Sequence, residues 1–202
     1  IEFHAGRFSV AGTDLGVGWR HVAKAAASGP LPQGEATGLD ESVLYKRSTE
    51  CNFPNGCHVA EVEIDPETGR LEVVRYTCVD DVGNVINPLL VHGQSHGGIA
   101  QGLGQAVLEN IVYDPGNGQL LTASFQDYAM PRASDLPGLN VDFHVVPTPV
   151  NELGVKGAGE GGACGAPPAI VSAACDALGV PHVDMPLTPE RVWRALGGLR
   201  EV

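Results

Sequence analysis

Two consecutive segments with a period of two residues constrain the fold of this chain most. Residues 58–65 (HVAEVEID) alternate between apolar and polar side chains, and residues 71–79 (LEVVRYTCV) are rich in β-branched side chains. Such patterns are typical of strands. The sequence PETG at 66–69 separates the two segments and favours a turn. We therefore predict a β-hairpin that spans residues 58–79.

A long helix is predicted after the hairpin, over residues 89–110, with residues 80–88 as the connecting loop. Its apolar positions Ile99, Leu103 and Ala106 recur at steps of three and four residues. It also contains glycine at 93, 97, 98, 102 and 104. Each glycine costs about 1 kcal/mol in an exposed helix interior. Either a second backbone or a ligand lies close to these glycines, or the helix begins later and follows a glycine loop.

Shorter elements are predicted over the rest of the chain. We expect short strands within 1–10, a helix over 19–27, a loop over 31–39, strands over 42–49 and 141–147, and a helix over 167–178. The last of these helices has Pro167 in its first turn and Gly179 after its end. A final helix begins with Thr188 as N-cap and Pro189 at its first position. These elements predict an α+β fold with mixed sheets flanked by helices.

Composition excludes several classes of protein. The 12 Lys and Arg against 24 Asp and Glu give a net charge of −12, which disfavours nucleic acid and anionic membrane surfaces as partners. No apolar run approaches the roughly 20 residues of a membrane span. The five cysteines include no CxxC pair, which favours reduced thiols in the cytoplasm over a zinc site. Without an initiator Met or a signal-peptide pattern, we expect the chain to begin within a longer protein.

One acid stands out because glycines surround it. Glu160 lies in the loop GVKGAGEGGACGAPPA at 154–169, just before a predicted helix. Glycines let a backbone approach a ligand, and free amides near a helix N-terminus suit an anion. A carboxylate placed there could serve as a general base. On spacing alone, a solvated surface glutamate is the commoner explanation.

Two alternative motifs have weaker support. Gly157, Gly159 and Gly162 match the dinucleotide pattern GxGxxG, but Pro147 and Pro149 interrupt the strand that should precede it, so a nicotinamide-binding dehydrogenase is disfavoured. His92 and His96 share a helix face as in HExxH, but Gly93 replaces the glutamate, and we expect surface or packing roles for both histidines.

The segment DDVGNVINPLLVHGQSHGG at 80–98 forms the second cluster of polar groups. Backbone amides, glycines and Gln94 at this loop-to-helix junction could hold a polar cofactor by neutral hydrogen bonds. Asp80 and Asp81 are expected on opposite faces of the chain, so that they do not share a proton. The sequence DYAMPR at 127–132 is expected to pin a loop.

Several blocks, taken in order, resemble one family. They are EVEIDPETGRLEVVRYTCVDDVGNVINPLLVHGQSHGGIAQGLGQAVLE, DYAMPRASDLP, LGVKGAGEGGACGAPPAIVSAACDALG and MPLTPERVWRAL. They look like the second molybdopterin-binding domain of the molybdenum-binding large subunit in the xanthine dehydrogenase and aldehyde oxidase family. The similarity is greatest to chains of the carbon monoxide dehydrogenase and aerobic aldehyde dehydrogenase type. It implies that residues 1–202 are the C-terminal domain of a longer subunit, with a strand and helix segment over 1–40 and the main cofactor-binding part over 41–202.

The resemblance implies a role for Glu160 as the general base at the molybdenum site. It implies cofactor-binding roles for Gln94 and for a set of further residues: Gly93, Gly97, Gly98, Asp81, Gly83, Asn87, Lys156, Gly157 and Gly159. The implied cofactor is molybdopterin, commonly the cytosine dinucleotide form in bacteria. Its pterin dithiolene holds the molybdenum, so no side chain is an expected metal ligand.

The family implies oxidation of an aldehyde, an N-heterocycle or carbon monoxide with oxygen derived from water. It also implies three partners besides the small-molecule substrate: the rest of the molybdenum subunit, an iron–sulfur unit and an FAD unit. The alternative is a non-catalytic piece or interaction domain that holds no cofactor by itself.

Overall fold

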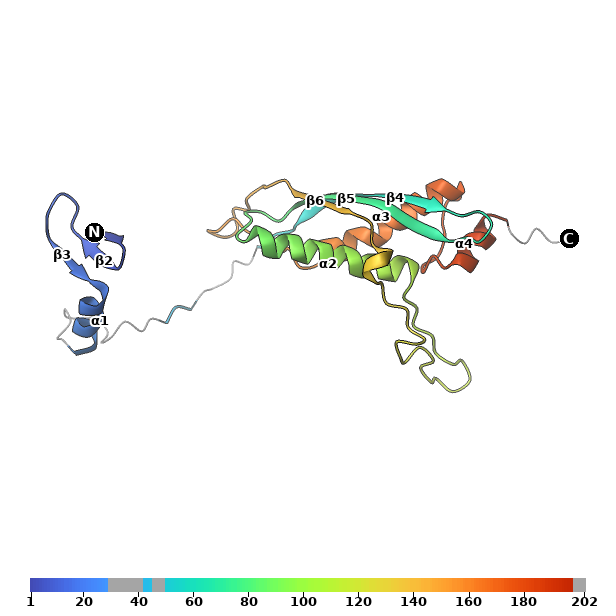
Figure 1. Ribbon diagram of the computed structural model, residues 1–202, viewed down its shortest axis with the longest axis horizontal. Coiled ribbons are helices and arrows are strands. Elements are labelled where there is room, and N and C mark those ends of the chain that lie inside the picture. The colour runs from blue at the N-terminus through green and yellow to red at the C-terminus, as the bar shows by residue number, and fades with distance from the viewer. Residues whose placement is uncertain (29–41, 45–49, 198–202) are drawn as a thin grey trace. The chain divides into compact units, whose positions relative to one another are not determined.

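The structure is a computed structural model that describes residues 1–28, 42–44 and 50–197 (Figure 1). The chain divides into two compact units, residues 1–47 and residues 48–202. The predicted 31–39 loop and residues 45–49 of a predicted strand lie outside the described residues. The predicted boundary between residues 40 and 41 falls there as well. Residues 42–44 form no strand, so the described part of that prediction is wrong.

The first unit is a small antiparallel sheet followed by a helix. Strands β1 (Glu2–His4), β2 (Arg7–Ser9) and β3 (Gly16–Gly18) pair in this order, and α1 (Trp19–Ser28) follows directly. The ring centroids of Phe3 and Phe8 lie 4.6 Å apart, and those of Phe8 and Trp19 lie 5.7 Å apart. These stacked aromatic rings join the sheet to α1. The predicted strands and the predicted helix are both confirmed in this unit.

A three-stranded mixed sheet forms the frame of the second unit. Strands β4 (Asn55–Ile64) and β5 (Leu71–Asp81) form the predicted hairpin, and β6 (Leu139–Phe143) pairs in parallel with the central strand β5. Glu61 pairs with Arg75 but Val62 pairs with Val73, so Val74 is an extra residue in β5. This bulge keeps Val73 on the same buried face as Tyr76.

Helices α2 (Pro88–Val107) and α3 (Gly161–Leu178) pack together and contact the sheet (Figure 1). The core between the layers holds β5, α2 and α3 side chains together: Val73, Tyr76, Cys78, Ile99, Leu103, Ala106, Ala166, Ile170 and Ala174. A short helix, α4 (Pro189–Ala195), adds Val192 to this core and is capped by Thr188 as predicted. Between α2 and the 3-10 turn η1 (Ala133–Asp135), the chain projects away from the helices (Figure 1).

Glycines explain how closely α2 and α3 approach each other. A Cβ on Gly162 would lie 2.7 Å from both the backbone N of Ile99 and the carbonyl O of Ser95. A Cβ on Gly102 would lie 2.7 Å from Cβ of Ala166. Any larger side chain would force the helices apart. The glycine-rich stretch of α2 therefore contacts a second backbone along one side, which is one of the two explanations predicted for it.

Three predicted boundaries need correction. Helix α3 begins at Gly161, so Pro167 lies inside it and not in its first turn. Pro167 has no N–H for the carbonyl of Ala163, but that carbonyl faces Gly102 of α2, and the packing of the two helices stabilises the additional turns. Strand β5 includes Asp80 and Asp81, which were expected in a loop. Strand β6 ends at Phe143 because the next residues bond to the end of β5 outside the regular ladder.

Candidate functional site

Two loops, one after β5 and one before α3, are joined by backbone hydrogen bonds. The amide of Asn84 donates to the carbonyl of Gly154 at 3.0 Å, and the amide of Lys156 donates to the carbonyl of Val82 at 2.8 Å. Gly83 pairs with Val155 as an isolated bridge, and its φ is +67°. A Cβ on Gly83 would collide with the carbonyl of Gly154, so both conformation and space require glycine there.

A buried ion pair joins the same two loops. Lys156 Nζ donates to Asp81 Oδ2, and the two side chains are 10% and 7% exposed. Asp81 Oδ1 accepts from the backbone amides of Gly83 and Val146 at 2.9 and 3.1 Å. Burial raises the pKa of Asp81, but the hydrogen bonds from Lys156 and these amides outweigh burial and lower it below its usual value. Asp81, Gly83 and Lys156 therefore join the two loops, and their expected place beside a cofactor stays a prediction.

Gln94 and Glu160 are brought together from distant parts of the sequence. Gln94 lies in the second turn of α2, and its Nε2 donates to the carbonyl of Gly159 at 3.0 Å. Glu160 follows at the N-cap position of α3, and its carbonyl accepts from the amide of Cys164. Its side chain is exposed and makes no capping bond to the helix. The carboxylate is therefore available for another group.

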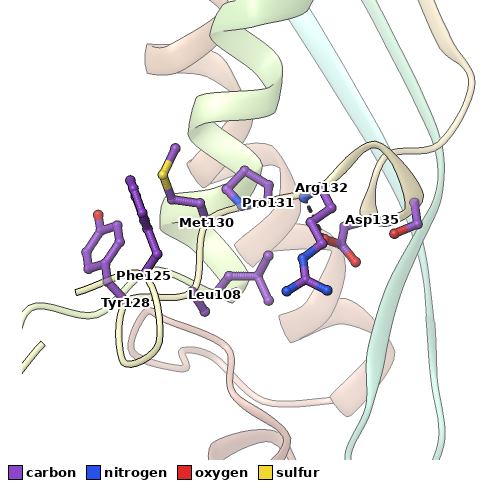
Figure 2. Close-up of a pocket in the computed structure, with 9 residues that line it drawn as sticks. Leu108, Phe125, Tyr128, Met130, Pro131, Arg132 and Asp135 are labelled. Carbon is purple, nitrogen blue, oxygen red and sulfur yellow. Dashed lines mark hydrogen bonds between the residues drawn. The ribbon is translucent and has the colours of Figure 1, made fainter.

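A cavity of about 680 Å³ lies beside this acid. Its wall includes Gly157, Ala158, Gly159 and Glu160 on one side, while Gly56, His58, Asp80 and Cys164 come from β4, β5 and α3. A cavity of this size suits a small molecule or part of a cofactor. It is larger than the hollow of about 420 Å³ at the base of the projecting segment (Figure 2).

The second hollow is smaller, and two of its polar residues, Tyr128 and Asp135, are engaged in bonds of the projecting segment, while the Arg132 guanidinium borders it. Figure 2 shows Phe125 and Tyr128 on one side and Arg132 on the other. The Tyr128 hydroxyl donates to Glu109, and Asp135 accepts from the backbone N of Arg132 at 2.7 Å. The Tyr128 bond pins the projecting segment to Glu109 just after α2, as expected for the DYAMPR sequence, whereas the bond at Arg132 is local to the η1 turn. The cavity at Glu160 is therefore the stronger candidate.

The remaining glycines of the site border open space in the described chain. A Cβ on Gly93, Gly97, Gly157 or Gly159 would meet no atom within 4 Å, and none of these residues has a positive φ. Neither packing nor backbone conformation within the described chain explains them, and in α2 each costs about 1 kcal/mol. Bare backbone fits a bulky ligand that approaches closely. The residues present therefore fit a large polar cofactor that lies against α2 and the 157–160 loop.

Two other expected ligands have positions that are explained within the chain. Gly98 faces α3, where a Cβ would lie 3.0 Å from the backbone N of Ala163. Asn87 is the N-cap of α2, and its Oδ1 accepts from the amide of Leu90 at 3.3 Å. Both residues therefore shape the site through α2, and their expected contact with a cofactor stays a prediction.

His92 and His96, for which surface or packing roles were expected, are half-buried and exposed, respectively. His92 and His96 have ring centroids 6.2 Å apart, and the ring of His92 lies 4.9 Å from that of Phe143. Among the described residues, a different group, His58, Cys78 and Asp80, has ligand atoms close enough to hold a metal. Burial raises the pKa of the Cys78 thiol to about 12, which opposes the thiolate that a metal needs.

In the described part of the chain, no helix is long and apolar enough to cross a membrane.

Sequence reasoning missed the histidine in this group. His58 Nδ1 lies 2.7 Å from the Tyr76 hydroxyl, and its Nε2 lies 3.0 Å from Asp80 Oδ1. The period of two residues places Tyr76, Cys78 and Asp80 on one face of β5, and His58 pairs with Cys78 in the hairpin register. Register within the predicted hairpin was the available signal for this cluster.

Comparison with known proteins settles the family. The Molybdopterin cofactor-binding domain family matches residues 1–137. The chain belongs to this family. As a molybdopterin cofactor-binding domain it is of the type found in xanthine dehydrogenase and aldehyde oxidoreductase enzymes, as the resemblance predicted. Glu160 lies beyond the matched range, but relatives align with nearly the whole chain.

Two curated relatives illustrate the likeness. The chain is 37% identical over 210 residues to subunit gamma of the 6-hydroxypseudooxynicotine dehydrogenase complex of Paenarthrobacter nicotinovorans, which covers 100% of this chain and 26% of that protein. It is 35% identical over 205 residues to the carbon monoxide dehydrogenase large chain of Hydrogenophaga pseudoflava, which covers 97% of this chain and 24% of that protein. The chain thus spans about a quarter of the length of these relatives.

Solved structures confirm the predicted fold class. Carbon monoxide dehydrogenase from Oligotropha carboxidovorans matches with a TM-score of 0.83 at 32% identity, over 98% of this chain and 25% of that one. Quinoline 2-oxidoreductase from Pseudomonas putida 86 matches with a TM-score of 0.81 at 36% identity, over 90% of this chain and 24% of that one. The α+β arrangement of mixed sheets and flanking helices is therefore shared with these molybdopterin-binding domains.

Proposed function

We propose that this domain contributes the general base and one wall of the cofactor site to a molybdenum hydroxylase. The observation that carries the proposal is the bond from Gln94 to the carbonyl of Gly159, which holds Glu160 beside open glycine backbone at the largest cavity described above. The reaction would oxidise an aldehyde, an N-heterocycle or carbon monoxide. Both curated relatives described above are subunits of enzymes named as dehydrogenases.

The residues of this chain would have different roles in the site. Gly93, Gly97, Gly157 and Gly159 would lie against the cofactor, which we propose to be the cytosine dinucleotide form of molybdopterin. When bound, this group supplies molybdenum that accepts the electron pair removed from the substrate. Gln94 holds the loop, and the Asp81–Lys156 pair fixes its other end. The Glu160 carboxylate accepts the proton of the water-derived oxygen that is transferred to the substrate.

Partners follow from the same proposal. We propose that the domain functions with the rest of a molybdenum subunit and with iron–sulfur and FAD units that carry the electrons away. Several large apolar side chains are exposed in this chain and suit such contacts: Ile86, Leu89, Leu90, Ile111 and Phe125 are between 61% and 82% exposed. A reducing cytoplasmic location is also proposed, and the five unpaired thiols support it.

Replacement of Glu160 by Gln in the assembled protein tests the base. We expect turnover to fall by a factor of about 10²–10⁴, with molybdenum and pterin contents unchanged, because the amide cannot accept the proton. Glu152→Gln is the matched control, since Glu152 is an exposed acid of the same loop region and should keep normal turnover. Near-normal turnover of the Glu160→Gln variant would refute the assignment.

The rival is a non-catalytic interaction domain. Its test is metal and pterin analysis of the assembled protein, because a catalytic domain must be isolated with molybdenum and a pterin dinucleotide.

A nicotinamide-binding role is disfavoured by the position of Gly157 well beyond the end of β6 at Phe143, since the dinucleotide motif must follow a strand directly. Calorimetry with NAD(H) should show no binding.

A further inference from the structure

A chain of three buried polar side chains lies beneath the first turns of α3. Tyr76 is fully buried, and the side chains of His58 and Asp80 are each 9% exposed. A carboxylate only accepts hydrogen bonds, so His58 Nε2–H donates to Asp80 at 3.0 Å. In the neutral ring, Nδ1 then accepts from the Tyr76 hydroxyl at 2.7 Å. Each partner fixes the orientation of the imidazole.

Helix α3 rests directly on this chain. A Cβ on Gly165 would lie 2.7 Å from three atoms of the His58 ring, so the helix backbone touches the ring face. A Cβ on Gly161, the residue after Glu160, would lie 3.6 Å from Asp80 Oδ2. A Cβ on Gly56 would collide with Asp80 Oδ1. Glycine on both sides thus lets β4 and α3 close over the His58–Asp80 pair.

The start of α3 needs external support. It contains Gly161, Gly162 and Gly165, which lose more backbone entropy than other residues when they become helical. The N-cap residue, Glu160, makes no side-chain bond to the helix. A carboxylate near a helix N-terminus is favourable for the helix dipole, and Asp80 is an acid that lies there. The carbonyl of Asp80 also accepts from His144 at 3.0 Å, which anchors it to the segment after β6.

We propose that the Tyr76–His58–Asp80 chain is a positioning element for Glu160. It contacts the first turns of α3 at Gly161 and Gly165, while Gln94 bonds to Gly159, the residue before Glu160. His58 and Asp80 also border the cavity, but their contacts with the backbone at Gly165 and Gly161 make them positioning residues in this proposal. The inference rests on the proposed role of Glu160, but it also predicts how firmly the 157–166 segment is held, whatever that segment does.

The test compares variants of His58 in the purified, assembled protein. His58→Phe keeps a ring of similar size but removes both hydrogen bonds, whereas His58→Gln keeps one donor and one acceptor. Asp80→Asn is a second, independent disruption. Arg75→Gln is the matched control, because Arg75 lies on β5 and forms an exposed ion pair with Glu61.

Two readouts separate positioning from a general loss of stability. We expect amide hydrogen exchange in residues 157–166 to become about tenfold faster in His58→Phe and Asp80→Asn, with α2 unchanged. Turnover should fall at least about tenfold while KM changes less than about threefold, because misplacement of a catalytic group acts on kcat. Molybdenum and pterin contents should not change, and His58→Gln and Arg75→Gln should resemble the parent protein.

Two results would overturn the proposal. One is unchanged exchange in residues 157–166 of both disrupting variants. The other is an increase of exchange throughout α2 and α3 that His58→Gln shares, since this indicates a core defect. If Glu160→Gln keeps full turnover while exchange in 157–166 responds as expected, the role of Glu160 as base fails but the positioning of this segment stands.

Discussion

Replacement of Gly97 by alanine tests whether the open side of α2 receives a cofactor. A Cβ there meets no atom within 4 Å. Alanine should therefore stabilise the domain by about 1 kcal/mol, the difference in helix propensity. Gly162→Ala is the contrasting variant, because its Cβ would lie 2.7 Å from the backbone N of Ile99 and the carbonyl of Ser95.

The magnitudes follow from these two environments. Overpacking against rigid backbone costs up to about 3 kcal/mol, and the propensity gain of about 1 kcal/mol leaves Gly162→Ala destabilised by about 2 kcal/mol. The two variants should thus differ by about 3 kcal/mol in free energy of unfolding. At roughly 2–4 °C per kcal/mol, this separates their melting temperatures by about 6–12 °C.

The decisive assay is cofactor content. If cofactor lies against Gly97, the added methyl group should weaken binding about tenfold through a steric cost of 1–2 kcal/mol, although the variant is the more stable protein. Urea unfolding measures stability, and molybdenum and pterin analysis measures occupancy. A Gly97→Ala variant with full cofactor content would refute the inference drawn from the open glycines. Destabilisation equal to that of Gly162→Ala would refute the packing of α2.

Four further predictions concern groups with perturbed pKa values or buried partners. Lys156→Met should lower the free energy of unfolding by roughly 3 kcal/mol at neutral pH, measured in urea, because it leaves the Asp81 carboxylate buried and unpaired. The pKa of Asp81 is lower in the folded than in the unfolded protein, so the ionised Asp81 stabilises the fold above pH about 4, and this contribution is lost as the pH falls through the pKa of the folded state. Asp81→Asn should therefore make the free energy of unfolding less dependent on pH in the acid range. Cys78, whose pKa burial raises to about 12, should resist thiol reagents until the protein unfolds, as mass spectrometry after timed labelling would show. Tyr128→Phe should speed proteolysis within residues 111–130, because it removes the bond to Glu109 that ties the projecting segment to the end of α2.

Local patterns predicted much of the fold. Alternation identified the β4–β5 hairpin, and capping residues identified the start of α4, because these signals depend only on neighbouring residues. The start of α3 could not be predicted, since Pro167 and Pro168 both lie inside that helix, and the packing against α2 at Gly102 is not visible in the sequence. The end of β6 at Phe143 likewise depends on bonds that the following residues make to β5.

The candidate site could likewise be predicted only in part from the sequence. Glycine spacing and family resemblance pointed to Glu160 and Gln94, and the structure brings them together through Gly159. No pattern along the chain distinguished Gly97, with open space above it, from Gly98, which contacts α3. Only the packing of the two helices separates these neighbours. His58 was missed because its partners, Tyr76 and Asp80, come from the other strand of the hairpin.

The backbone bonds between the two site loops bear on how such a domain can diversify. Asn84 and Lys156 contribute main-chain atoms to these bonds, so the bonds do not depend on the side chains of the cavity wall, provided that Gly83 and the Asp81–Lys156 pair are kept. Substitutions at exposed positions of the cavity wall such as Cys164 can therefore alter what the cavity accepts without dismantling its frame. A scaffold of this kind separates architecture from selectivity, and it offers protein engineers sites for change that leave the position of Glu160 intact.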